Sequence, residues 1–225
     1  MLILTSPKRL KMNIYLLSGL GADKRVFSRL VFSANHVIRH IEWISPISNE
    51  GLSSYAERLS RQIDEAEPFC LVGISFGGMV AVELNKFVKP LQTIIISSAS
   101  TDLQIPWYYK VLGRLKIHTL VPVKILKAPT ALTFWFFGTK TDEEKNMLTE
   151  ILKETDGKFL RWSISKITNW DHKIRPEGIY QVHGTSDRIL PASYIKADLE
   201  VRNGGHLMVY SKSEIISSIL ANRLG

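Results

Sequence analysis

The chain has 225 residues, of which 45% are hydrophobic and 22% are charged, and its formal net charge is +8. This length fits one domain with a large core, and the composition is that of an ordinary globular protein. No stretch reaches the roughly 18 apolar residues of a membrane-spanning helix, and lysine and arginine form no long run. We therefore expect no integral membrane association and no nucleic-acid binding. The single cysteine, Cys70, excludes an internal disulfide and makes the cytoplasm the default location.

Residues 1–12 precede the first strand pattern. Lys8, Arg9 and Lys11 interrupt the apolar start before a signal-peptide core of adequate length can form, so we do not expect export. We interpret the segment as a disordered extension, or as the product of an upstream start codon that is not used. Residues 13–225 are expected to form a single domain.

Short apolar runs rich in β-branched residues recur along the chain. They are Asn13–Ser18, Val37–Trp43, Cys70–Ile74, Thr93–Ser97, Gly178–His183 and Asp198–Arg202. Several runs are apolar on both faces and alternate with helical patterns, which is typical of a parallel sheet covered by helices on both faces. The sequence predicts an α/β fold with a mostly parallel sheet of about six strands.

Apolar stripes at helical spacing predict helices between and after these strands. Ser54 with Glu57, and Ser211 with Glu214, have the spacing of capping boxes at the starts of two such helices.

Residues 101 to about 172 interrupt the alternation, because they contain no strand pattern and are rich in aromatic residues. Thr141 and Glu144 have the spacing of a further capping box before another apolar stripe. We predict that this segment is a helical cap inserted into the same domain.

The cap sequence supplies candidate substrate contacts. Trp107, Trp135 and Trp162 are candidates for a substrate pocket, although aromatic residues at helical spacing fill a core equally often. Five lysines and arginines face one aspartate between residues 101 and 130. This excess favours a solvated face, with an anionic substrate or a membrane surface as the alternative.

Residues 73–78 read Gly-Ile-Ser-Phe-Gly-Gly, between a predicted strand and a helical segment. A G-x-S-x-G motif in this context is typical of a nucleophile elbow, whose tight turn raises the serine hydroxyl above the sheet edge. Gly73 and Gly77 would avoid collisions with neighbouring backbone. The motif is weak alone, but with both flanks present it predicts Ser75 as a catalytic nucleophile.

A serine nucleophile needs a general base, and the base needs a carboxylate that fixes its tautomer. Asp187 and His206 follow the fifth and sixth predicted strands, so both are expected at the sheet edge that presents Ser75. The order Ser, Asp, His is the one that accompanies this motif. We predict that His206 is the base and Asp187 its partner, with Asp102, after the fourth strand, as the reserve candidate for the acid.

Acyl transfer also needs backbone N–H groups that stabilise the developing oxyanion. The candidates are the amides of Phe76, next to the nucleophile, and of Leu20, beside Gly19 in the loop after the first strand. Gly19 and Gly21 do not begin a dinucleotide fingerprint, because Lys24 replaces the third glycine. The sequence has no zinc-ligand spacing and no phosphate-binding loop, so it implies neither metal nor cofactor.

With the elbow at Ser75 and the loops of Asp187 and His206, the chain resembles the α/β-hydrolase superfamily, in particular small cap-bearing members of uncharacterised type. The resemblance extends from Gly19 to the helix after His206. The resemblance implies hydrolysis of an ester, a thioester or a related bond of a small-molecule acyl substrate without a cofactor. Ser18 departs from the family, in which a histidine often precedes the glycine of the oxyanion loop. The two antiparallel strands that open the family's sheet are also missing.

The first hypothesis is therefore a serine hydrolase of the esterase or thioesterase type, which forms an acyl-enzyme on Ser75 from a short- or medium-chain acyl ester. An acyltransferase or a lyase could use the same residues, and a non-enzymatic ligand-binding protein could retain the fold. We interpret His183 as a neighbour of the acid loop, since one base is enough. His172 is expected to have a surface or capping role.

Overall fold

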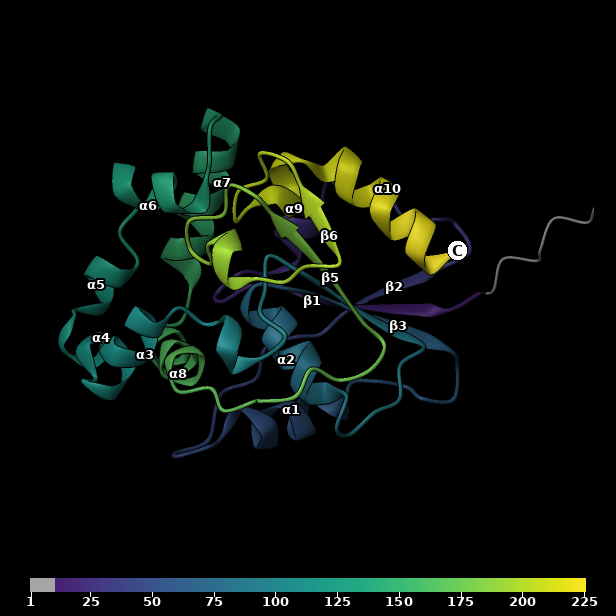
Figure 1. Ribbon diagram of the computed structural model, residues 1–225, viewed down its shortest axis with the longest axis horizontal. Helices are drawn as coiled ribbons and strands as arrows, with labels where there is room; N and C mark the ends of the chain where they lie inside the picture. The colour runs from purple at the N-terminus through teal and green to yellow at the C-terminus, as the bar shows by residue number, and fades with distance from the viewer. Residues whose placement is uncertain (1–10) are drawn as a thin grey trace, which may run out of the picture.

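The computed structural model describes residues 11–225 and contains one central sheet with helices on both faces (Figure 1). The extension predicted at residues 1–12 falls almost entirely on residues 1–10, which lie outside the described residues. Met12, directly before the first strand, is buried, and its sulfur lies 3.5 Å from Sγ of Cys70. Met12, which we assigned to the extension, therefore belongs to the folded core.

Six strands form the sheet in the order β2-β1-β3-β4-β5-β6, and every neighbouring pair is parallel. They are β1 (Asn13–Leu17), β2 (Val37–His40), β3 (Phe69–Ile74), β4 (Gln92–Ile96), β5 (Ile179–Gly184) and β6 (Leu199–Val201). The prediction of an α/β fold with about six strands is confirmed, and the sheet is parallel throughout. Because β2 and β3 lie on opposite sides of β1, the strand order reverses between β1 and β3.

The helices and short 3₁₀ turns follow the alternation that the sequence predicts. They are η1 (Lys24–Phe27), α1 (Leu52–Ser60), α2 (Phe76–Leu84), η2 (Asp102–Gln104), α3 (Trp107–Arg114), α4 (Ile117–Leu120), α5 (Val123–Leu126), α6 (Ala131–Phe137), α7 (Asp142–Glu154), α8 (Gly157–Thr168), η3 (Ala192–Tyr194), α9 (Met208–Ser211) and α10 (Ser213–Leu224). In the part of the chain that the structure describes, no helix combines the length and the apolar character needed to cross a bilayer.

Alternate residues of the strands supply two separate cores, one on each face of the sheet. Tyr15 and Leu17 of β1 pack in the core that α1 and α2 cover, whereas Ile14 and Leu16 pack in the core that α9 and α10 cover. This arrangement explains why the strand sequences are apolar on both faces.

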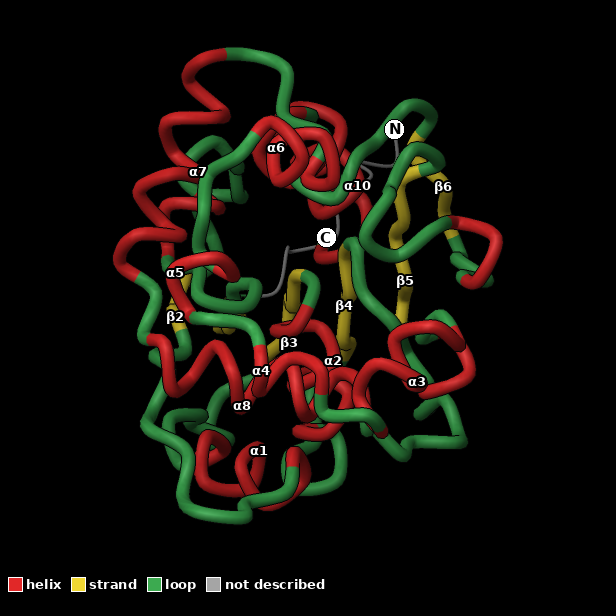
Figure 2. The backbone as a smooth tube through the Cα atoms, turned by 90° about the vertical axis from the view of Figure 1, so that its left-hand side faces the viewer, coloured by secondary structure: helices red, strands yellow, loops and turns green. Residues whose placement is uncertain are grey.

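All regular elements between β4 and β5 are helices or 3₁₀ turns, from η2 to α8, and they gather on one side of the molecule (Figure 2). Thr141 and Glu144 form the predicted capping box at the start of α7. The other two predicted boxes are wrong. The N-cap of α1 is Gly51, three residues before Ser54, so Ser54 and Glu57 lie inside the helix. The N-cap of α10 is Lys212, one residue after Ser211. Neither N-cap residue makes a side-chain hydrogen bond.

Glu83 of α2 is buried in a polar cluster that joins this helix to the segment after α8. Its carboxylate accepts hydrogen bonds from Nε1 of Trp170 (2.8 Å), Nδ1 of His172 (2.9 Å) and Nζ of Lys86 (2.5 Å). Burial alone would raise the pKa of Glu83, but these donors outweigh it and lower the pKa to about 2. The expectation of a surface or capping role for His172 is wrong, since its ring is buried and stacked on Trp170.

We expect Glu83→Gln to remove a pH-dependent part of the stability. Because folding lowers the pKa of Glu83 from its ordinary 4.5 to about 2, its stabilising effect is complete above about 4.5 and is lost as the pH falls toward 2. The shift corresponds to about 3 kcal/mol at neutral pH. Urea unfolding between about pH 6 and pH 3 should therefore show a steeper loss of stability in the wild type than in Glu83→Gln. Exposed Glu57→Gln is the matched control, and equal pH dependence of all three proteins would contradict the prediction.

Candidate active site

Ser75 stands at the turn between β3 and α2 with φ 51° and ψ −121°, a strained conformation for a residue other than glycine. The two flanking glycines permit this turn. A Cβ at Gly73 would lie 2.5 Å from the carbonyl oxygen of Gly77, and a Cβ at Gly77 would overlap the carbonyl oxygens of Leu17 and Ser18. The chain therefore forms the predicted elbow geometry, and the elbow contacts the backbone at the end of β1.

The elbow and the loop after β1 meet where the strand order reverses. In open parallel sheets this position leaves a crevice at the carboxyl ends of the strands, because neighbouring connections run to opposite faces. Here the crevice lies between β1 and β3, and the cap elements lie over the same end of the sheet.

Ser75, His206 and Asp187 form one chain of hydrogen bonds. Nε2 of His206 lies 2.9 Å from Oγ of Ser75, and Nδ1 lies 2.8 Å from Oδ2 of Asp187. A carboxylate accepts, so Nδ1 carries the proton, and Nε2 of the neutral ring is left to accept from the serine hydroxyl. The structure thus brings together the three residues that the sequence singles out, and both His206 and Asp187 are buried.

The loop after β5 holds Asp187 in its charged form. Its second oxygen, Oδ1, accepts backbone hydrogen bonds from Ile189 and Leu190, each 2.9 Å long. Burial alone would raise the pKa of Asp187, but the interactions with His206 and the bond from Leu190 lower it below its usual value. The carboxylate is therefore ionised and oriented at neutral pH.

His183 and Asp102 have other partners. Nε2 of His183 donates to the carbonyl oxygen of Leu190 (2.8 Å), and burial lowers the pKa of His183, which keeps the ring neutral. Asp102 forms ion pairs with Lys110 (3.0 Å) and Lys173 (2.7 Å). The carboxylate in contact with His206 is that of Asp187, as we expect from the chain order.

The loop after β1 presents a backbone donor beside Ser75. A Cβ at Gly19 would lie 3.5 Å from Cβ of Ser75, so the loop passes directly over the elbow. Neither the amide of Leu20 nor that of Phe76 donates a hydrogen bond to any of the described residues. Both N–H groups are therefore available to an oxyanion at this position.

Ser18 holds the turn of this loop, a role that the sequence did not reveal. Its hydroxyl donates to the carbonyl oxygen of Ala22 (2.6 Å) and accepts from Nε1 of Trp43 (3.0 Å). The loop after β1 is therefore held by the Ser18 hydroxyl within it and by the Trp43 indole from the loop after β2.

An apolar cavity of about 230 Å³ opens at Ser75 and His206 and continues between the sheet and the cap. It is lined by Gly19, Leu20, Ala22, Val26, Ile74, Ser75, Leu126, Thr133, Phe137, Leu148, Ile151, Leu152, Leu160, Ile167, Ile189, His206, Leu207 and Val209. Thr133 is the only cap residue with a polar side chain among these lining residues. The cavity therefore fits an apolar chain attached to a group held at Ser75.

The predicted tryptophans do not line this cavity. Trp107 and Trp135 are exposed, at 66% and 52%, because they lie on the outer faces of α3 and α6. Trp162 packs on Tyr55 and Phe76 and donates to the carbonyl oxygen of Glu50, so it fills a core. Aliphatic residues of α7 and α8 occupy the place that we assigned to aromatic ones.

No protein-family model matches the chain, and no curated protein matches it in sequence. Its structure is similar to that of MenH from S. aureus, with a TM-score of 0.71 and 11% identity over 97% of this chain and 95% of the other. A lipase-esterase related protein from Clostridium acetobutylicum has a TM-score of 0.70 and 11% identity over 96% and 95%. A hydrolase from Pseudomonas aeruginosa has a TM-score of 0.68 and 14% identity over 96% and 90%. The chain has the α/β-hydrolase fold.

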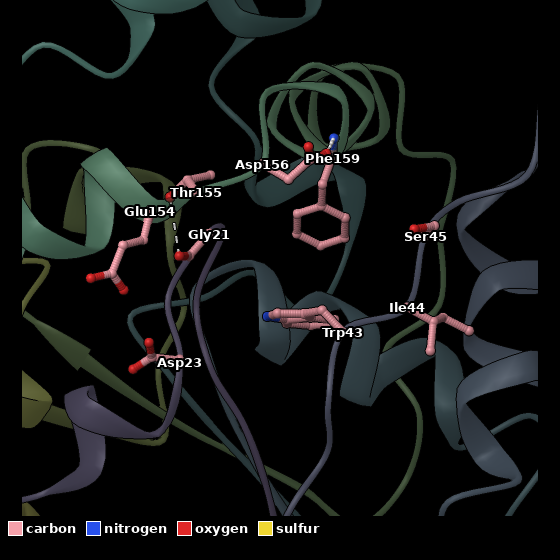
Figure 3. Close-up of a pocket in the computed structure, with 9 residues that line it drawn as sticks. All are labelled: Gly21, Asp23, Trp43, Ile44, Ser45, Glu154, Thr155, Asp156 and Phe159. Atoms are coloured by element: carbon pink, nitrogen blue, oxygen red, sulfur yellow. Dashed lines mark hydrogen bonds between the residues drawn. The ribbon is translucent and has the colours of Figure 1, made fainter.

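The cap of this α/β-hydrolase fold is joined to the loop after β1 at the α7–α8 turn. Oγ1 of Thr155 lies 2.7 Å from the carbonyl oxygen of Ile151 and 3.1 Å from that of Gly21, so these two acceptors share its one proton. A Cβ at Gly21 would overlap Thr155, which shows how closely the two segments approach (Figure 3). No motif marks Thr155 in the sequence. The contact depends on two segments more than 130 residues apart, so only the fold reveals it.

Figure 3 also shows a second pocket, of about 320 Å³, in which the ring of Phe159 lies over that of Trp43. It does not include Ser75 or His206 among its lining residues. Asp23 and Glu154 on its rim are both paired with Arg25. In residues 11–225 no group of three or more histidine, cysteine, aspartate or glutamate side chains could hold a metal ion.

Gly77→Ala should destabilise the fold because the added methyl group meets rigid backbone of β1 and its loop. We expect a loss of about 3 kcal/mol in the free energy of unfolding, the upper end for an overpacked site. Gly51→Ala is the control, because a Cβ there meets nothing within 4 Å. Equal midpoints of urea unfolding for both variants would contradict the close approach at the elbow.

Proposed function

We propose that the protein is a serine hydrolase that cleaves a carboxylic ester or thioester through an acyl-enzyme on Ser75. The observation that carries the proposal is the unbroken hydrogen-bond chain from Asp187 through His206 to Ser75, at the mouth of an apolar cavity. The fold supports it, since solved structures of the same fold include proteins named as esterases and hydrolases.

In the first half of the reaction, Oγ of Ser75 attacks the acyl carbon while Nε2 of His206 takes the hydroxyl proton. The carbonyl oxygen becomes an oxyanion, and the amides of Leu20 and Phe76 donate to it. Each such donor contributes about 3 kcal/mol to the stability of the transition state. Asp187 stabilises the imidazolium, which then gives its proton to the departing alkoxide or thiolate.

In the second half, a water molecule attacks the acyl-enzyme and gives a proton to His206. The tetrahedral intermediate collapses, Oγ of Ser75 regains the proton and the carboxylic acid leaves. An acyltransferase would replace this water by another acceptor, so analysis of the released products separates the two reactions.

We expect a fluorophosphonate probe to add one label to the wild type, and none to Ser75→Ala, because the probe reacts with activated serines. Labelling of His206→Ala should be slower by about 100-fold or more, since the general base is absent. Intact-mass spectrometry measures both. Ser186→Ala, an exposed serine beside Asp187, is the control and should label like the wild type. A folded wild-type protein without label would refute an activated serine and favour the ligand-binding alternative.

The cavity also predicts a preference among acyl chains. At about 30 Å³ for each water-sized group, a volume of 230 Å³ holds on the order of eight carbon atoms. Activity on p-nitrophenyl esters should therefore rise from acetyl to about octanoyl and then fall. Each carbon that no longer fits should lower kcat/KM by about tenfold.

Ile151 of α7, which lines the cavity, tests this preference in both directions. Ile151→Phe should move the optimum to shorter chains, and Ile151→Ala should move it to longer ones. Exposed Ile174→Phe is the control for added bulk. An optimum that is the same in all four proteins would show that the chain binds elsewhere.

A further inference from the structure

The cap exposes many apolar side chains to solvent. Six large ones between residues 107 and 135 are more than half exposed: Trp107, Leu115, Leu120, Ile125, Leu132 and Trp135. They come from α3 to α6 and the turns between them, which lie at the left of Figure 1, on the side that faces the viewer in Figure 2. Among the described residues, eleven large apolar side chains are more than half exposed, and these six are among them. Such a concentration marks an interaction surface.

The charged residues in this part of the cap are all basic. Residues 103–140 contain six lysines and arginines and neither aspartate nor glutamate. Arg114, Lys116 and Lys124 are exposed, and none of the three forms an ion pair with a described residue. The surface therefore presents apolar and cationic groups together, which is the composition of elements that bind the interface of anionic bilayers.

A basic pocket of about 410 Å³ opens within this surface. Arg114, Lys116 and His118 line it, together with the polar side chains of Thr119, Ser165 and Asn169. Arg161 fixes one wall, because its guanidinium donates to the carbonyl oxygens of His118, Thr119 and Val121. Exposed Leu115 and Leu120 flank the pocket in sequence.

We propose that the outer face of α3 to α6 docks on an anionic lipid surface, with a phosphate headgroup in the pocket of Arg114 and Lys116 and the exposed leucines among the acyl chains. A second copy of this chain is a poor occupant, because two surfaces without acidic groups would repel each other. Apolar side chains beside cations suit a bilayer interface, which offers both an apolar layer and negative charge.

Two residues of this part of the cap adjoin the cavity at Ser75. Leu126 and Thr133 line the cavity, and their sequence neighbours Ile125 and Leu132 are exposed on the outer face. The docked face would therefore carry part of the cavity wall on its inner side. If the proposed hydrolase function holds, acyl substrates reach Ser75 from the lipid surface. The docking itself does not depend on that function.

Vesicle flotation tests the docking with the full-length protein. We compare vesicles of phosphatidylcholine alone with vesicles that contain about 30% phosphatidylglycerol, at low and at physiological salt. The wild type should bind the anionic vesicles at least about tenfold better, and salt should weaken the binding. Leu115→Ser with Leu120→Ser, and Arg114→Glu with Lys116→Glu, should each reduce the binding about tenfold or more.

Leu91→Ser with Lys89→Glu is the matched control, because these exposed residues precede β4 at the opposite edge of the sheet. Fluorophosphonate labelling in solution, unchanged in every variant, shows that each is folded and separates a failure of docking from a failure of the hydrolase. If the labelled wild type does not float with anionic vesicles, docking is refuted. Equal loss in the control pair, or full competition by millimolar inorganic phosphate, would also overturn it.

Discussion

The close approach of the elbow to the end of β1 is the constraint on which the rest of the site depends. Gly77 has no room for a Cβ because the carbonyl oxygens of Leu17 and Ser18 occupy that space. This contact fixes the positive φ of Ser75 and brings the loop after β1 over the hydroxyl. The strand order reverses between β1 and β3, so this meeting of loops lies at the position where parallel sheets form a crevice.

The sequence predicted what depends on local pattern and on chain order. Strands apolar on both faces are recognisable without a structure, and Ser75, Asp187 and His206 each follow a strand, so a parallel sheet carries all three to one edge. Contacts between distant segments could not be predicted in this way. The capping boxes illustrate the limit: the pair Thr141 and Glu144 does cap α7, but the same spacing at Ser54 and Glu57 falls inside α1, because an earlier residue already begins that helix.

The cap shows a second limit of sequence patterns, which is that an apolar stripe does not say which way it faces. Trp107 and Trp135 have the type and spacing of pocket residues, yet the short helices α3 and α6 turn them outward. The cavity is lined instead by aliphatic residues of α7 and α8, such as Ile151 and Leu160, whose stripes are longer and face the sheet. Helices of four to eight residues expose most of their surface, so their apolar residues need an external partner or remain in water.

The link between Thr155 and Gly21 joins these two regions of the molecule. Thr155 lies at the end of α7 and Gly21 in the loop that carries Leu20, so a displacement of the cap would also move the loop of the proposed oxyanion donor. Ser18 and Trp43 resist that pull from the opposite side, through the hydrogen bonds that close the turn. The position of the amide of Leu20 therefore depends on both the sheet and the cap. A substrate that orders the cap by filling the apolar cavity would thereby also order the donor that its own reaction requires.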